Sequence, residues 1–342
     1  MGNGQKLKNA LRERIESRVK NISVETTGEG LFFFKEAGKS NREFVRRVFC
    51  GDLPEQHFND LYDQAIGGSG SEDGNMCNAI SSSLFAFLFF SRVSKDNPIT
   101  IDGIEYTHVC FEFKNRTLSG KSDFAPSNID VVLASNDYKD ILFIESKFGE
   151  YFYSLTSAAT EYKGLSIQYA QKGSTVPIIA GILSGNRLHL KKNDNELVFK
   201  DDNEPHYFEG IKQMLTHISG ISNFKAGSFC STNHVHSYDM AKKAFEDALQ
   251  NADSEKNELT VALQEIVFDL DKGFGLGKNE LGDYKELHNC LQKALKGIKL
   301  DFEVRPLITY QDFVDLKENE GYFKSLPPII QAYFNKQEPK AD

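Results

Sequence analysis

Two short apolar runs that carry embedded charges constrain this chain more than any other feature. They cover residues 128–134 and 141–147, and turn-forming residues separate them at 135–140. This order predicts a β-hairpin. Residues 141–144 are continuously apolar, which indicates that the second strand is central and buried on both faces.

Three charged side chains lie on this predicted hairpin. Asp130 is near the start of the first strand, and Glu145 and Lys147 are near the end of the second. Strand alternation places Glu145 and Lys147 on one face, and an antiparallel return brings Asp130 close to them. Two carboxylates and a lysine are costly to bury unless something pairs them. A divalent cation would do so. The alternative is a hairpin whose Glu145 and Lys147 form an ordinary surface ion pair, which contributes little to stability.

The rest of the chain alternates between helical and extended patterns. The patterns predict helices at 5–22, twice within 38–65, and at 75–93, 154–172, 205–218, 279–295 and 310–318. They predict strands at 99–104, 106–113, 176–183, 261–270 and 302–308, and a hairpin-like excursion at 187–200. We therefore expect an α/β fold in which helices cover both faces of a mixed sheet. The expected division is a helical segment at 1–70, a domain at 71–335 and a polar tail at 336–342.

Composition excludes several classes of protein. The net charge of −9 argues against a uniformly basic nucleic-acid coat, although a local basic groove is compatible with it. The five cysteines are scattered and form no Cys-x-x-Cys pair, which favours free thiols in a reducing compartment. The N-terminus lacks an apolar export segment, and the most apolar run, 84–90, is too short to span a bilayer. We expect a cytoplasmic protein with no membrane partner.

Three local patterns look functional but fit ordinary structure better. The glycine-rich stretch 273–279 has Lys272 where a phosphate loop needs its first glycine, and Asn279 where it needs Ser or Thr. The serine run 81–83 has no Gly-x-Ser-x-Gly frame, which argues against a serine hydrolase. The pair His234 and His236 has no third metal ligand nearby in the sequence, so a loop is the better interpretation.

The order Asp130, fourteen residues, then Glu145-Ser146-Lys147 resembles the PD-(D/E)XK nuclease superfamily, which includes restriction endonucleases. In that superfamily a strand with the Asp precedes a strand with the E-x-K motif. Ile129 stands where the family has a proline that is often replaced. Residues 67–93 and 210–220 also resemble a bacterial branch of restriction-endonuclease-like proteins, so the resemblance extends patchily over about residues 60–270.

The resemblance implies a restriction-endonuclease-like fold and hydrolysis of DNA phosphodiester bonds, as in a restriction or defence endonuclease. It implies that Asp130, Glu145 and the carbonyl of Ser146 bind Mg²⁺, with Mn²⁺ as a substitute, and that Lys147 assists the attacking water. Mg²⁺ prefers hard oxygen ligands and keeps several waters, so two carboxylates suffice. A lysine beside the metal has its neutral form favoured, which suits proton transfer. A homodimer is expected if both DNA strands are cut.

A third acidic ligand often comes from the first helix or the loop before it. Glu72 is the candidate, and a solvated loop acid or a helix N-terminal charge is the alternative. Glu112, on the neighbouring strand, is a rival for the same role, or it pairs with Lys114 instead. Glu150 is a candidate to support the metal ligands without binding the metal itself, unless it faces solvent.

Further candidate contacts come from helix 205–218 and from basic residues. Gln213 is a candidate contact with the active site or the DNA backbone, unless it is a polar surface residue. His217 shares the face of Gln213 and is expected to be structural. Basic residues at 114–121 and 187–192 are candidate phosphate contacts or ordinary surface charge.

Two other functions remain open. One is a catalytically silent member of the same fold that binds DNA or a protein, against which the intact Asp130, Glu145 and Lys147 argue. The other is a different metal- or nucleotide-binding enzyme, supported only by the imperfect glycine loop.

Overall fold

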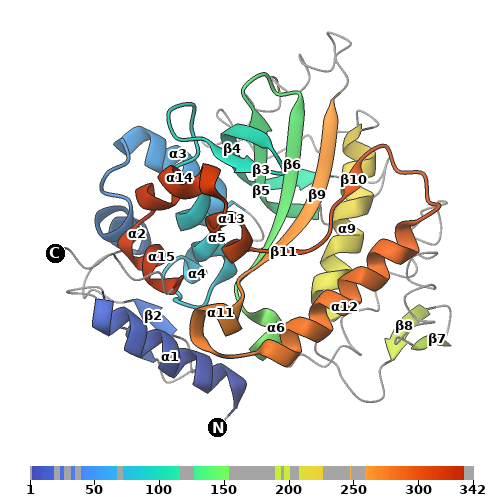
Figure 1. Ribbon diagram of the computed structural model, residues 1–342, viewed down its shortest axis with the longest axis horizontal. Coiled ribbons are helices and arrows are strands. Elements are labelled where there is room, and N and C mark those ends of the chain that lie inside the picture. Colours follow the sequence, from blue (N-terminus) through green and yellow to red (C-terminus); the bar gives the residue numbers. More distant parts are fainter. Residues whose placement is uncertain are drawn as a thin grey trace.

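The structure is a computed structural model, shown in Figure 1. It describes residues 2–18, 24–26, 32–34, 40–67, 72–115, 127–153, 189–193, 196–200, 208–225, 247 and 259–334. The strands are β1 (Val24–Thr26), β2 (Phe32–Phe34), β3 (Ile99–Ile101), β4 (Ile104–Asn115), β5 (Ser127–Ser135), β6 (Asp140–Lys147), β7 (His189–Asn193), β8 (Glu196–Lys200), β9 (Thr260–Val267), β10 (Glu303–Val304) and β11 (Ile308–Thr309). The helices are α1 (Asn3–Arg18), α2 (Asn41–Phe49), α3 (Glu55–Ala65), α4 (Glu72–Asn75), α5 (Ser82–Phe90), α6 (Glu150–Tyr153), α9 (Phe208–Lys225), α11 (Leu270–Phe274), α12 (Lys278–Leu295), α13 (Tyr310–Val314), α14 (Glu320–Ser325) and α15 (Pro328–Tyr333).

A mixed seven-stranded sheet lies at the centre of the molecule. Its strands follow the order β10-β9-β6-β5-β4-β3, and β11 also pairs with β9. Strands β3 to β6 pair antiparallel, whereas β9 runs parallel to β6 and to the short strands β10 and β11. The predicted α/β fold with a mixed sheet is therefore confirmed.

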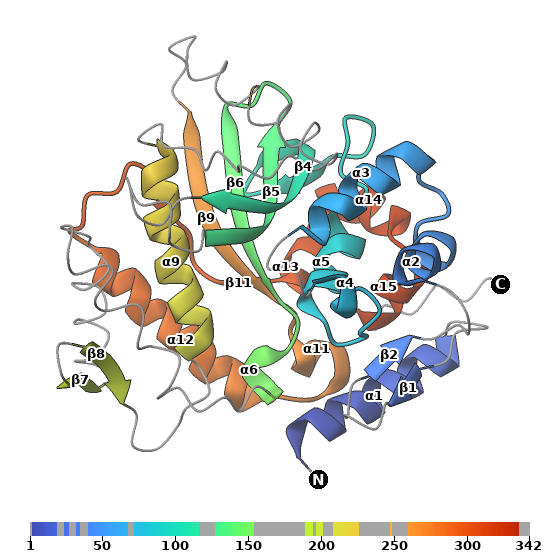
Figure 2. The ribbon, with the colours of Figure 1, turned by 180° about the vertical axis from the view of Figure 1, so that it is seen from behind.

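Helices cover both faces of this sheet. Helices α9 and α12 lie on one face, and α3, α5, α13 and α15 lie on the other, as both ribbon views show (Figures 1 and 2). The side chains behind this arrangement form two apolar cores. The first core contains side chains of α1, α2, α3, α5 and the C-terminal helices. The second core lies between the sheet and helices α9 and α12.

Turn chemistry explains the two hairpins of the sheet. Asp102 and Gly103 both have positive φ, at 51° and 78°, as the tight turn between β3 and β4 requires. In the turn between β5 and β6, the Ser135 hydroxyl donates to the Asp137 carboxylate and accepts from the Asp140 N–H. The hairpin predicted at 128–147 is confirmed, and the strands predicted at 99–104 and 106–113 correspond to β3 and β4.

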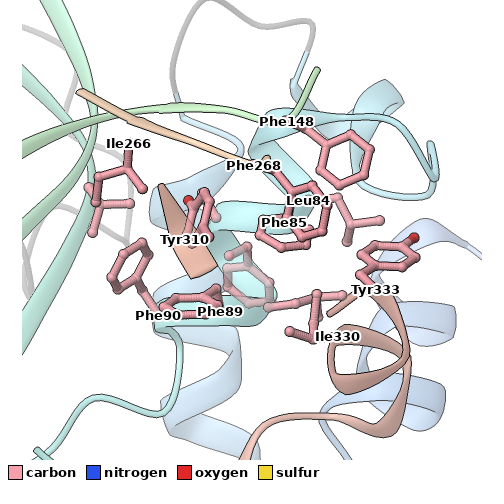
Figure 3. Close-up of a cluster of buried hydrophobic side chains, with 14 of the residues drawn as sticks. Leu84, Phe85, Phe89, Phe90, Phe148, Ile266, Phe268, Tyr310, Ile330 and Tyr333 are labelled. Atoms are coloured by element: carbon pink, nitrogen blue, oxygen red, sulfur yellow. The ribbon is translucent and has the colours of Figure 1, made fainter. Parts of the chain in front are cut away.

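The larger core is rich in phenylalanine (Figure 3). Helix α5 begins at an N-cap, Ser81, whose hydroxyl accepts from the Leu84 N–H, and every residue from Leu84 to Phe90 is buried. The ring of Phe85 lies 4.8 to 5.3 Å, between centroids, from those of Phe148, Phe268 and Tyr310. Helix α5 thereby connects β6, β9 and the C-terminal helices.

Most predicted elements appear with shifted ends. The buried helix predicted at 75–93 is shorter because Ser81 caps it. The strand predicted at 261–270 ends at Val267, since Asp269 caps α11. The glycine-rich stretch begins inside α11, and residues 275–277 form the turn between α11 and α12, with Gly275 and Gly277 at positive φ.

Some of the chain was not predicted or lies outside the described residues. Helices α14 and α15 were not expected, although they contribute Tyr322 and Ile330 to the larger core. The predictions at 154–172 and 176–183, the residues His234 and His236, and the tail from 336 lie outside the described residues. The division at residue 70 stays a prediction, while the stripe of α1 packs into the same core as α5.

Two coarse expectations from composition agree with the structure. Within the described ranges, no helix combines the length and apolar character that crossing a bilayer requires. Cys50, Cys77, Cys110 and Cys290 are free thiols.

Replacing Phe85 by alanine tests the role of the phenylalanine-rich core. We expect a loss of about 3–5 kcal/mol in the free energy of unfolding, because a large buried ring is removed from several close neighbours. Urea unfolding followed by circular dichroism measures this change. The matched control is Leu316, a large apolar residue of which 39 % is exposed to solvent. Leu316→Ala should change the free energy of unfolding by less than about 0.5 kcal/mol. Equal losses in both variants would contradict the assignment.

Candidate active site

Strands β4 and β5 reverse their faces at Glu112 and Asp130. Residues two apart in a regular strand share a face, yet Phe111 and Phe113 belong to different cores, and so do Ile129 and Val131. Glu112, between the two phenylalanines, has a φ of 50°, a left-handed value that is uncommon outside glycine. Such irregularities recur next to active sites, where they re-aim a side chain.

The Asp130 side chain replaces a backbone acceptor between β5 and β6. The two strands pair from Ala134 with Ile141 to Val131 with Ile144, where the regular pairing ends. Beyond this last pair, the Ser146 N–H of β6 donates to Oδ2 of Asp130 on β5 at 2.7 Å. Strand β6 remains paired with β9 on its other edge through Lys147. The sheet therefore opens between β5 and β6 at Asp130, while β6 itself stays anchored.

Glu145 is the most deeply buried member of the cluster. It is 1 % exposed, and each carboxylate oxygen has its own partner. Lys147 Nζ donates to Oε1 at 2.5 Å, and His217 Nε2, from α9, lies 2.7 Å from Oε2. His217 Nδ1 in turn contacts the Ser127 hydroxyl at the start of β5. Glu145 thus links β6 to α9 and to β5.

The charges of the cluster act on one another. Burial and the neighbouring Glu145 raise the pKa of Asp130 well above its ordinary value, although Lys147 and the Ser146 N–H oppose the change. Burial also disfavours the charge on Glu145, but Lys147 and His217 outweigh it and hold its pKa at about 2. Burial disfavours the Lys147 ammonium, yet Glu145 and Asp130 raise its pKa. Without a metal, Lys147 is therefore protonated, and the ionised form of Asp130 is disfavoured.

Ser146 fixes the cluster from the other face of the sheet. Its hydroxyl lies 2.7 Å from the Tyr310 hydroxyl of α13, in the larger core. Its N–H points towards β5 and Asp130, and in a strand the carbonyl of a residue points to the same edge as its N–H. The carbonyl predicted as a ligand is thus on the edge of β6 that Asp130 occupies.

A second buried carboxylate lies beside the first. Glu265 on β9 is in register with Glu145 on β6, so both side chains project from the same face. Glu265 is fully buried, and the hydroxyl of Tyr284 on α12 donates to its Oε1. His288 Nε2, also on α12, lies 3.2 Å from Glu265 Oε2, but the two are not aligned for a hydrogen bond. Glu265 is one of the acids that act on the charge of Lys147.

Asp130 and Glu145, the two carboxylates predicted as metal ligands, act on each other's charge in this cluster. Asp130 uses one oxygen for the Ser146 N–H, and its raised pKa reflects repulsion that a cation would offset. Two carboxylates and several waters are the usual set for Mg²⁺. Among the described residues, however, no three His, Cys, Asp or Glu side chains are arranged to hold a metal ion together.

The other predicted site residues are Glu72, Gln213, Glu112 and Glu150. Glu72 is the first residue of α4, and its side chain lies outside what the structure describes. Gln213 lies one turn before His217 on α9, but within the described residues no hydrogen bond or ion pair joins it to the cluster. Glu112 is buried beside the point where the faces reverse. Glu150 accepts from the Gly149 N–H and contributes to the field at Lys147.

The basic segments are described only in part. Lys114 pairs with Asn128 in the sheet, near the site end of β4. Arg116, Lys121 and Arg187 lie outside the described residues. Residues 189–193 form β7, which pairs with β8 as the predicted hairpin. Their role as phosphate contacts stays a prediction.

Sequence reasoning missed two parts of the site. His217 was expected to be structural, whereas it contacts Glu145. Glu265 was absorbed into an apolar strand, although a lone charged residue inside such a run is a signal for a buried polar site. No pattern in the sequence distinguished His288 from other helical residues.

Comparisons with known proteins identify no relative. No family model, curated protein or solved structure matches this chain.

The substitutions Asp130→Asn and Glu145→Gln should change the free energy of unfolding in opposite directions. Asp130→Asn replaces a group whose ionised form burial and Glu145 disfavour with a neutral side chain, so the free energy of unfolding of the metal-free protein should rise by about 1 kcal/mol. Glu145→Gln leaves Lys147 buried without its charged partner and should lower the free energy of unfolding by about 3 kcal/mol. Urea unfolding at pH 7 with a chelator measures both, and changes of equal sign would contradict the described electrostatics.

The pH dependence of stability provides a separate test. The pKa of Glu145 is about 2 in the folded protein, below its ordinary value of 4.5, so its charge stabilises the fold above pH 4.5. That contribution is lost as the pH falls towards 2. Glu145→Gln should therefore unfold with a weaker pH dependence between about 4.5 and 2 than the wild type. Urea midpoints across that range measure it, and parallel curves would contradict the prediction.

Proposed function

We propose that this protein is a metal-dependent nuclease of the PD-(D/E)XK type that hydrolyses DNA phosphodiester bonds. The observation that carries the proposal is the convergence of Asp130, Glu145 and Lys147 at the point where β5 separates from β6. The order of the strands and the helix before them are those expected for a restriction-endonuclease-like fold. That finer fold assignment is part of the proposal.

The residues of the cluster divide the work in a way that suits phosphodiester hydrolysis. Asp130, Glu145 and the Ser146 carbonyl would hold Mg²⁺, or Mn²⁺ in its place. When bound, this ion lowers the pKa of a water molecule and polarises the scissile phosphate. The Lys147 ammonium lies where it would stabilise the negative charge that develops on the phosphate. His217 and Ser127 hold the Glu145 carboxylate in one orientation.

Access to the cluster is from the Asp130 side. Asp130 is partly exposed, whereas Glu145 and Lys147 are buried. The DNA backbone would therefore approach Asp130, at the opening between β5 and β6. Because the chain carries a net charge of −9, phosphate contacts would have to come from local basic residues such as Lys114. Cleavage of both strands would bring two copies of the site together in a homodimer.

A catalytically silent binding module is the second candidate. One observation in its favour is that both carboxylate oxygens of Glu145 already have partners. Another is that no three His, Cys, Asp or Glu side chains among the described residues are arranged to hold a metal ion. Such a protein would bind DNA or another protein without cutting DNA.

A nuclease assay on supercoiled plasmid and single-stranded DNA, with Mg²⁺ or Mn²⁺, separates the two functions. We expect cleavage by the wild type, and a loss of at least about a hundredfold in Asp130→Ala and in Lys147→Ala, because each removes a group that acts on the reacting phosphate. Asp137→Ala is the matched control, since this acid lies in the distant turn of the same hairpin, and it should cleave like the wild type.

Three outcomes would decide the matter. Cleavage that survives in both site variants would overturn the assignment of the site. Salt-dependent DNA binding without cleavage would favour the binding module. Cleavage of RNA in preference to DNA would keep the site but correct the substrate.

A further inference from the structure

A cation on Glu145 would conflict with the ammonium group already there. Lys147 Nζ lies 2.5 Å from Glu145 Oε1, and His217 occupies Oε2. Two positive charges on one buried carboxylate repel each other strongly, because the surroundings screen them poorly. Metal binding at Glu145 therefore requires a second acceptor to which the ammonium of Lys147 can move.

Glu265 is placed to be that acceptor. It is in register with Glu145, and Lys147 lies two residues beyond Glu145 on the same face of β6. Adjacent strands are about 4.8 Å apart and rise about 3.3 Å per residue, so the Cα atoms of Lys147 and Glu265 are about 8 Å apart. The lysine and glutamate side chains together span that distance. The carboxylate of Glu265 already contributes to the field at Lys147.

Glu265 also has an acceptor that nothing else satisfies. Tyr284 donates to Oε1, but Oε2 is buried without a hydrogen-bond partner in the described part of the chain. The nearest donor, His288 Nε2, is 3.2 Å away without hydrogen-bond geometry and is itself unsatisfied. A buried carboxylate oxygen without a hydrogen-bond partner is costly, and a functional role is one of the explanations for such an atom.

We propose that Glu265 is a positioning residue that receives the Lys147 ammonium when a divalent cation binds Glu145. This inference rests on the proposed function, since it assumes the metal site at Asp130 and Glu145. In the metal-free protein Lys147 neutralises Glu145. In the metal-bound protein it pairs with Glu265 and donates to the Oε2 atom that has no hydrogen-bond partner in the described part of the chain. The Tyr284 hydroxyl of α12 holds the Glu265 carboxylate throughout.

Mn²⁺ binding to the full-length protein, measured by isothermal titration calorimetry, tests the proposal without any nuclease readout. Glu265→Gln keeps the shape of the side chain and an acceptor for Tyr284, but removes the charge that would receive Lys147. We expect the Kd for Mn²⁺ to rise about tenfold to a hundredfold, since a hydrogen bond to a charged partner is lost only in the metal-bound state. Asp137→Asn is the matched control, because this acid lies in the turn at the other end of the same hairpin, and it should change the Kd less than about threefold.

A double-mutant cycle establishes whether Glu265 acts through Lys147. In Lys147→Met no ammonium needs a new partner, so adding Glu265→Gln should leave the Kd for Mn²⁺ unchanged within about twofold. An equal loss of affinity in both backgrounds would overturn the proposal and make Glu265 a direct ligand instead. Thermal unfolding of the metal-free variants confirms that each is folded before titration.

Two further outcomes separate this proposal from the function it rests on. If the wild type binds Mn²⁺ and Glu265→Gln binds it equally well, the role of Glu265 is wrong while the metal site stands. If the wild type itself binds no Mn²⁺, the metal site fails, and the role of Glu265 fails with it.

Discussion

The buried charge of Glu145 is the constraint on which the rest of this structure depends. A carboxylate on a central strand is tolerated only if its oxygens are paired, and Lys147 and His217 supply the two partners. Lys147 comes from the same strand, but His217 has to be brought there by α9, and Ser127 orients its ring. The packing of α9 on the sheet, the start of β5 and the end of β6 are therefore determined together by one side chain.

The same region combines a rigid edge with an irregular one. On the β9 side, β6 pairs without interruption to Lys147, and Ser146 is held by Tyr310 in the phenylalanine-rich core. On the β5 side the pairing ends at Val131, and the Asp130 carboxylate takes over as acceptor for Ser146. Catalytic groups need a fixed frame and an accessible opening. Both are met here because the strands diverge on one edge of β6 only.

Sequence patterns predicted the frame of this molecule far better than the interior of its site. The hairpin, the strand after it and the amphipathic stripe of α1 follow from apolar periodicity and turn residues, which are local. The contact of His217 with Glu145 joins residues 72 positions apart, and no local pattern encodes it. The reversal of faces at Glu112 was equally invisible, because it depends on a backbone angle that glutamate rarely adopts. Glu265 was within reach of sequence reasoning, as a single acid in an otherwise apolar strand.

The balance of charge at the site supports the proposed cation. Asp130, Glu145, Glu150 and Glu265 all act on Lys147, so several acids share the field of one ammonium group. Two of these acids lack sufficient compensation. Burial and Glu145 oppose the ionisation of Asp130, and the Oε2 atom of Glu265 lacks a hydrogen bond within the described residues. A divalent cation between Asp130 and Glu145 would supply the missing positive charge for the first acid. It would also release Lys147 towards the second, so that one binding event satisfies both. The unfavourable features of the metal-free site are thus those that a metal would remove.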